Sequence, residues 1–315
     1  MSAYDRGVAK PSDEIIDCFW VAPDKSVAYA GPVFRHPLDS QSTGRLYVAG
    51  VVQTIVCHAQ RPHRATLTVI STGYFAVYVN NWKVDLASIA PYRSYGDTLT
   101  KGICYDVTRF MHRDSNVVAV WYSPVFPHIE PRQLSVSLVT TDSQGRTSVH
   151  NSDSGWLCHR ATRSLNADGG ETIDGQSYPL KWYNGFTDQA LWQPAVNIKA
   201  SPLLGYTIEE HFRPQMKMQK IRNQNYFDLV GDTVYYEFGL GFYGNLRVTI
   251  RDAHPGQVLH IGNLTYTCNG KTDEQAISRF APAYYRRIPV WGKNFRHKQI
   301  QNFEAIELAP VWPTF

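Results

Sequence analysis

The sequence contains few charged residues, which make up 18% of its 315 positions, against roughly 25% in typical domains. Coiled coils and long surface helices depend on Glu and Lys, so this shortage argues against a fold dominated by such helices. No window approaches 18 consecutive apolar residues, and we therefore expect no membrane-spanning helix. The hydrophobic fraction of 43% still provides a sizeable core and excludes a wholly disordered chain.

Cysteine is also scarce, with five residues that lie far apart in the sequence. There is no C-x-x-C pair, which argues against a zinc knuckle or a thioredoxin-like motif. The N-terminus has no apolar stretch behind a basic start, so it does not resemble a secretory signal. An odd number of cysteines without such a signal predicts free thiols and a cytoplasmic location. A mature extracellular form, with its signal removed, remains the alternative.

Strand signals recur along the whole chain. Runs rich in β-branched and aromatic residues are bounded by Gly, Pro and Asn, which is the pattern of strands and hairpins. The expected strands include residues 45–58, 65–70, 73–79, 117–122, 134–139, 233–238, 245–250 and 257–261. Asn80 and Asn81 predict a tight hairpin, because Asn tolerates positive φ. Only residues 107–111 and 188–192 suggest short helices, so the sequence predicts an all-β sandwich or barrel protein.

Two domains are expected from the length of the chain. The strand rhythm breaks at residues 199–205, and residues 209–214 read as a polar connector. The sequence therefore predicts one β-sandwich over residues 13–200 and a second over residues 201–315. No internal repeat of fixed period is present.

Several segments of the chain resemble bacterial α-L-rhamnosidases. The stretch TLTVISTGYFAVYVNNWKV at residues 66–84 is similar to a strand–hairpin–strand motif of that family. Further similar segments follow in the same order along residues 50–310. They are IAPY at 89–92, YDVT at 105–108, GW at 155–156, IDGQSY at 173–178, ALWQPAV at 190–196 and YEFGLGFYG at 236–244. No one motif is decisive, and the resemblance rests on their shared order and spacing.

The resemblance implies two β-sandwich domains, jelly-roll-like and concanavalin-like, which in the family precede a helical catalytic barrel. The family's acidic catalytic motif does not occur in these residues, and inverting hydrolysis needs an acid and a base about 6.5–9.5 Å apart. We therefore lean against an enzymatic activity. Leu240 and Gly241 stand where the family has Gln-Asn, and Asn263 stands at an acidic position. Some relatives bind calcium near the position of Asp174, but one oxygen ligand is missing here, so no cofactor is expected and a calcium site is in doubt.

One segment supplies the groups that a sugar site needs. Rings with exposed faces can stack on a sugar, and carboxylates or amides can bind its hydroxyls. The candidate sugar-binding residues are Asp174, Gln176, Tyr178, Trp182, Tyr183 and Asn184. Alternatively, Tyr178 and Trp182 pack in the core or between domains, since Trp and Tyr are mostly buried. Trp156 and Trp192 are expected to be core residues.

A second segment is basic and rich in aromatic residues. Residues 279–298 contain six Lys or Arg and no acid. The candidate basic patch comprises Arg286, Arg287, Lys293, Arg296 and Lys298. Without these five and Arg279, which completes the six, the formal charge falls from +4 to −2, with 25 positive against 27 negative residues. Such a segment can bind single-stranded nucleic acid or an acidic sugar, but we favour a solvated strand face with Ile288, Val290 and Trp291 pointing inward.

Other chemistry is not indicated. The histidines show no H-E-x-x-H or i,i+4 pattern, so no metal site is expected. No nucleophile elbow or phosphate-binding loop is placed after a strand. Asp174, Glu209, Glu210 and Glu237 could form an acidic site between the domains, but they are scattered in the sequence.

The leading hypothesis is a non-catalytic carbohydrate-binding protein that binds rhamnose or rhamnosides. We expect a carbohydrate partner, no membrane contact and no nucleic acid. Three alternatives stay open, namely an assembly module that forms homo-oligomers or joins a partner catalytic chain, an enzyme with a site between the domains, and a truncated rhamnosidase.

Overall fold

The structure is a computed structural model, and it confirms that the chain is all-β. It describes residues 28–33, 45–47, 51–57, 60–85, 87–91, 100–124, 134–153, 155–159, 161–166, 168–177, 183, 192–199, 206–208 and 215–311. Within these ranges the chain forms strands β1 to β25 and short 3₁₀ turns, such as Thr108–Phe110. None of the helices in this part of the chain is long and apolar enough to cross a membrane.

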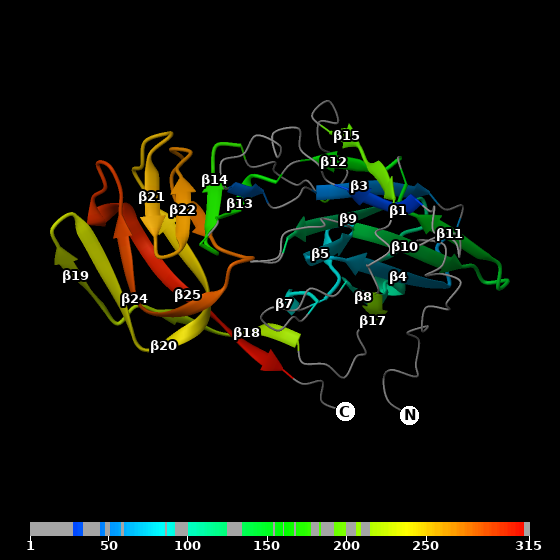
Figure 1. Cartoon of the computed structure of the whole chain (residues 1–315). Coiled ribbons are helices and arrows are strands. Elements are labelled where there is room, and N and C mark those ends of the chain that lie inside the picture. Colours follow the sequence, from blue (N-terminus) through cyan, green and yellow to red (C-terminus); the bar gives the residue numbers. More distant parts are fainter. Residues whose placement is uncertain are drawn as a thin grey trace.

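The first of two bodies, seen on the right in Figure 1, contains two sheets. One has the order β11 (Thr147–Asn151), β10 (Leu134–Thr141), β4 (Arg64–Ser71), β8 (Thr100–Asp106) and β17 (Tyr206–Ile208). The other has the order β15 (Gln193–Pro194), β12 (Leu157–His159), β3 (Val51–Cys57), β9 (Ser115–Ser123), β5 (Tyr74–Val79) and β6 (Trp82–Lys83). Strands β1 (Ala28–Val33) and β16 (Val196–Lys199) form a separate pair.

The two sheets enclose a hydrophobic core. Leu67 on β4 and Val118 and Val120 on β9 are fully buried members of one cluster. Because side chains alternate along a strand, the next residues of β9 point to the opposite face, where Ala119 and Trp121 belong to a different cluster. Both faces of β9 are therefore buried, and this matches the uninterrupted apolar run of the sequence.

The hairpin predicted at Asn80 and Asn81 is confirmed, and it joins β5 to β6. Val79 pairs with Trp82, and the two turn residues Asn80 and Asn81 have φ of 49° and 72°. The core prediction for Trp156 and Trp192 is also confirmed, since they are 4% and 7% exposed. The cysteines whose side chains are described, Cys104, Cys158 and Cys268, are buried thiols that form no disulfide, and burial raises the pKa of Cys104 to about 11.

The second body is built around a twelve-stranded sheet, whose last strand β7 (Ala87–Ile89) extends into the first body, since Ala87 belongs to the core of that body. Its order is β2 (Arg45–Tyr47), β13 (Arg163–Asn166), β14 (Glu171–Asp174), β22 (Leu264–Thr267), β21 (Val258–Ile261), β24 (Ala283–Trp291), β20 (Thr233–Ile250), β25 (Ile300–Val311), β18 (Gln215–Asn223) and β7 (Ala87–Ile89). Strands β19 (Tyr226–Val230) and β23 (Glu274–Ile277) also pair with β20.

The long strand β20 folds this sheet around its core. Its first half pairs with β24 and its second half with β25, and the register shifts between Glu237 and Phe242. Gly241 in this bulge has φ of 83°, a conformation that L side chains rarely adopt. The bend lets one strand contribute Phe238 and Leu246, both fully buried, to the same cluster as Phe303 of β25.

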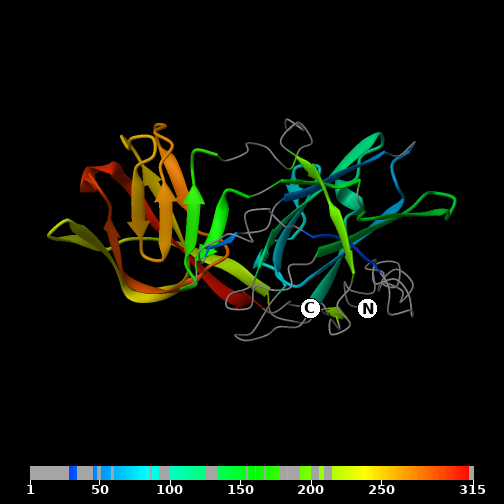
Figure 2. The ribbon, with the colours of Figure 1, turned by 45° about the horizontal axis from the view of Figure 1, so that its top comes forward.

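The chain passes between the two bodies more than once. Strands β13 and β14 precede residue 200, yet β14 pairs in parallel with β22, with Asp174 opposite Thr267. Conversely, β17 follows residue 200 and pairs with β8 of the first body. Figure 2 shows β13 and β14 beside the strands of the second body. The second body therefore receives strands from both sides of the predicted boundary.

A buried cluster joins the two bodies. Trp121 from β9 packs edge-on against Phe280, with ring centroids 5.4 Å apart. The guanidinium of Arg279 lies 4.8 Å from the Trp121 ring and donates to the Tyr78 hydroxyl at 3.1 Å. Arg279 and Phe280 are themselves held by their backbone N–H groups, which donate to the Glu171 carboxylate at 2.6 and 3.2 Å.

Candidate functional site

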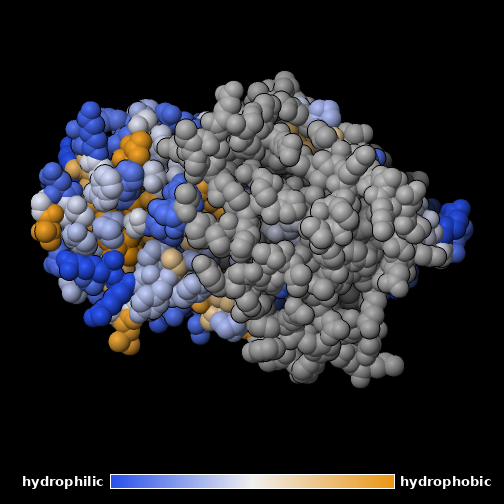
Figure 3. Space-filling model, in the orientation of Figure 1, coloured by the Kyte–Doolittle hydropathy of each residue, from blue (hydrophilic) through white to orange (hydrophobic). Residues whose placement is uncertain are grey.

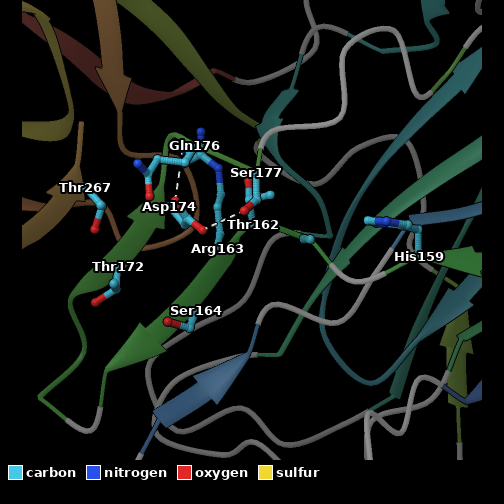
Figure 4. A pocket seen from close by; sticks show the side chains of 10 residues that line it. His159, Thr162, Arg163, Ser164, Thr172, Asp174, Gln176, Ser177 and Thr267 are labelled. Carbon is cyan, nitrogen blue, oxygen red and sulfur yellow. Dashed lines mark hydrogen bonds between the residues drawn. The ribbon is translucent and has the colours of Figure 1, made fainter. Parts of the chain in front are cut away.

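A cavity of about 450 Å³ lies where the two bodies meet. Strand β12 of the first body provides His159, while β13, β14, β22 and the turn after β14 provide the other side. The described residues that line it are His159, Ala161, Thr162, Arg163, Ser164, Thr172, Asp174, Gln176, Ser177 and Thr267. In Figure 4, His159 points from the first body toward the side chains at the end of β14. Hydroxyl groups predominate in this lining.

The turn after β14 is fixed by its own hydrogen bonds. The Asp174 carboxylate accepts the backbone N–H of Gln176 at 2.9 Å and the hydroxyl of Ser177 at 2.8 Å (Figure 4). The Gly175 N–H donates to the carbonyl of Thr267 at 2.9 Å. A Cβ at Gly175 would lie 2.4 Å from the Tyr266 hydroxyl, so only glycine lets the turn approach β22 this closely. The polar end of the turn is thereby held at the cavity.

The arginine of the described lining is already paired. Arg163 is 7% exposed, and its guanidinium lies 3.5 Å from the fully buried carboxylate of Glu171. The same guanidinium donates to the carbonyl of Ile277. The Asp174 carboxylate forms no ion pair within the described residues, so a neutral ligand suits the cavity better than an anionic one.

The structure brings two of the six predicted sugar-binding residues together. Asp174 and Gln176 line the cavity, with Gln176 exposed and Asp174 half-buried. Tyr183 stacks on Tyr78, with ring centroids 5.1 Å apart, and packs against the cluster between the bodies. Tyr178, Trp182 and Asn184 lie outside the described residues. Of the four candidate acids, Asp174 lies at the cavity and Glu237 pairs with Arg287 on the second body, while Glu209 and Glu210 lie outside the described residues.

Sequence reasoning missed most of the cavity. Thr267 reaches it only because β14 pairs with β22, and His159 comes from the other body. Neither position has a local signal, since a lone Thr or His within a strand is ordinary. Ser164 and Thr172 could have been found by alternation, because each is the polar neighbour of an apolar core residue in its strand.

The basic patch lies mainly on the surface, as predicted. Arg286, Arg287, Lys293, Arg296 and Lys298 are all exposed, and Ile288 and Val290 are fully buried. Arg287 lies 3.1 Å from the Glu237 carboxylate, which lowers its effective charge. The visible surface of this body is mostly hydrophilic (Figure 3).

The inward orientation predicted for Trp291 is wrong. Its side chain is 48% exposed and stacks on His260. The reason is strand alternation, since Val290 points into the core and its neighbour must point outward. Among the side chains described, no three or more His, Cys, Asp or Glu are grouped so that they could hold a metal ion.

Residues 60–218 match the family model of the alpha-L-rhamnosidase N-terminal domain. The chain belongs to this family. Solved α-L-rhamnosidases share its fold, at TM-scores of 0.72 for the Dictyoglumus thermophilum enzyme and 0.69 for that of Aspergillus terreus. The identities are 16% and 15%, and the match covers 83% and 88% of this chain.

The Streptomyces avermitilis α-L-rhamnosidase, solved with L-rhamnose, also matches at a TM-score of 0.72, with 16% identity over 85% of this chain. The chain spans 32%, 37% and 29% of the Dictyoglumus, Aspergillus and Streptomyces enzymes, or about a third of the length of these relatives. No curated protein matches the sequence. This chain is therefore a β-sandwich module related to α-L-rhamnosidases.

Proposed function

We propose that this chain is a non-catalytic carbohydrate-binding protein that holds a terminal neutral sugar, such as L-rhamnose, in the cavity between its two bodies. The observation that carries the proposal is the cavity itself. Its volume of about 450 Å³ lies within the range of small-molecule sites. Hydroxyls, one amide and one carboxylate face it, and these groups donate to and accept from sugar hydroxyls.

The charge of the lining favours a neutral sugar over a uronic acid. Arg163 is engaged by Glu171 at 3.5 Å and is not available to bind a carboxylate without breaking a buried ion pair. Asp174 repels anions, but it is a strong acceptor for two neighbouring hydroxyls. The match to an α-L-rhamnosidase solved with L-rhamnose supports rhamnose as the first probe.

The same lining favours binding over hydrolysis. Glycoside hydrolysis by two carboxyl groups needs both of them at the scissile bond. Asp174 is the one carboxylate among the described lining residues, and the nearby Glu171 is fully buried and occupied by backbone N–H groups. A cavity with one carboxylate and many hydroxyls supports recognition of the sugar without its cleavage.

Calorimetric titration with methyl α-L-rhamnoside tests the proposal. We expect saturable binding by the unmodified protein and weaker binding of glucuronic acid. Asp174→Asn keeps an oxygen for the turn but removes the charge, so it is expected to weaken rhamnoside binding at least about tenfold.

The matched control is Asp153→Asn. Asp153 also accepts a backbone N–H within its own turn, from Gly155 at 2.8 Å, but it lies away from the cavity lining. Its replacement is expected to leave the affinity unchanged. Absence of heat with every sugar up to millimolar concentration would contradict the proposal, as would equal affinities of the Asp174→Asn and unmodified proteins.

A further inference from the structure

A row of four side chains, which begins at the cavity with Thr172, crosses the outer face of the second body. Pairing places Thr172 of β14 opposite Thr265 of β22, and Thr265 opposite His260 of β21. His260 in turn lies opposite Trp291 of β24. Figure 1 shows these strands side by side, in the order β14, β22, β21 and β24.

All four side chains of this row lie on the same face. Their neighbours Ile173, Tyr266, Leu259 and Val290 belong to the buried core, so alternation directs the row outward. Contacts agree with this placement, because His260 Nδ1 lies 3.2 Å from the Thr265 hydroxyl. Thr172 at one end of the row lines the cavity.

The far end of the row is an aromatic platform. The Trp291 and His260 rings stack with centroids 3.9 Å apart and planes inclined by 20°. Trp291 is 48% exposed. Burial lowers the pKa of His260 and so favours the uncharged form of this ring. An uncharged, flat and half-exposed pair of rings presents a face suited to the C–H side of a sugar.

The platform lies too far from the cavity for one sugar to reach both. Three inter-strand steps of about 4.8 Å separate β14 from β24, or about 14 Å in all. The hydroxyls between them can bind the intervening part of a ligand.

We infer that the outer face of β14, β22, β21 and β24 is an extended binding surface for an oligosaccharide, with its terminal sugar in the cavity and a later sugar stacked on Trp291. This inference rests on the proposed function and adds the length of the ligand. It makes Trp291 a determinant of affinity for oligosaccharides and not for monosaccharides.

The test compares an α-linked L-rhamnose tetrasaccharide with methyl α-L-rhamnoside by calorimetry. The unmodified protein is expected to bind the tetrasaccharide about tenfold more tightly, because covering roughly 60 Å² of apolar ring has about this effect. Trp291→Ala removes that advantage and leaves the affinity for the monosaccharide unchanged. Trp291→Phe, which keeps a ring, restores part of the advantage and also controls for folding.

Trp82→Ala is the matched control, since Trp82 is 64% exposed on β6 of the other body. It is expected to change neither affinity. Equal affinities for the two probes overturn the inference, and so does an equal effect of Trp291→Ala on both. If the cavity is not the sugar site, Asp174→Asn leaves the binding of both probes unaltered. That result contradicts the proposed function and is distinct from the results that overturn the extended surface.

Discussion

Replacing Glu171 with alanine is expected to lower the free energy of unfolding by about 3–5 kcal/mol. Glu171 is fully buried and accepts backbone N–H groups from Arg279 and Phe280 at 2.6 and 3.2 Å. It also lies 3.5 Å from the guanidinium of Arg163, which is 7% exposed. Its removal leaves a buried positive charge without its carboxylate and two N–H groups without their acceptor.

Urea unfolding measures this loss, and an exposed ion pair provides its control. Arg251 and Asp273 lie 2.6 Å apart but are 43% and 46% exposed, so Arg251→Ala is expected to cost about 1 kcal/mol or less. The cost of Glu171→Gln, which keeps the volume and one acceptor, should fall between the costs of Glu171→Ala and Arg251→Ala. A cost for Glu171→Ala similar to that of Arg251→Ala would show that Glu171 does not hold the junction.

Trp121→Ala is expected to destabilise the protein by a similar amount, about 3–5 kcal/mol. Trp121 is 4% exposed and fills the junction between the bodies, where it contacts Phe280 edge-on. Arg279 lies 4.8 Å and Arg163 5.3 Å from its ring. Alanine would leave a large cavity and remove both cation–π contacts.

Thermal unfolding of the Trp121→Ala variant, followed by calorimetry, measures both the loss of stability and the loss of coupling between the two bodies. Trp121 belongs to the first body and Phe280 to the second. The loss of the Trp121 ring is therefore expected to weaken the coupling between the two bodies and to broaden or split the unfolding transition. Trp82→Ala, which removes a largely exposed ring, should change stability by no more than about 0.5 kcal/mol. A single transition at the original temperature for Trp121→Ala is the result that would contradict this account.

The strands of this fold were predictable because their signals are local. The Asn80 and Asn81 hairpin and the doubly buried strand β9 follow from turn residues and apolar runs. Long-range pairing was not predictable in this way. The parallel pairing of β14 with β22 joins distant segments, and nothing within either strand specifies its partner.

The candidate site shows the same difference between local signals and long-range contacts. Asp174 and Gln176 were found because one turn places them together. Thr267 and His159 were missed because only tertiary contacts bring them to the cavity. The error at Trp291 was avoidable, since alternation from the buried Ile288 and Val290 directs it outward.

The most direct test of this account is a crystal structure of the protein with methyl α-L-rhamnoside. The account predicts one sugar ring in the cavity, with its hydroxyls bonded to Asp174 and Thr267 and the paired Arg163 and Glu171 undisturbed. A sugar bound only elsewhere, with the cavity filled by water, would contradict it.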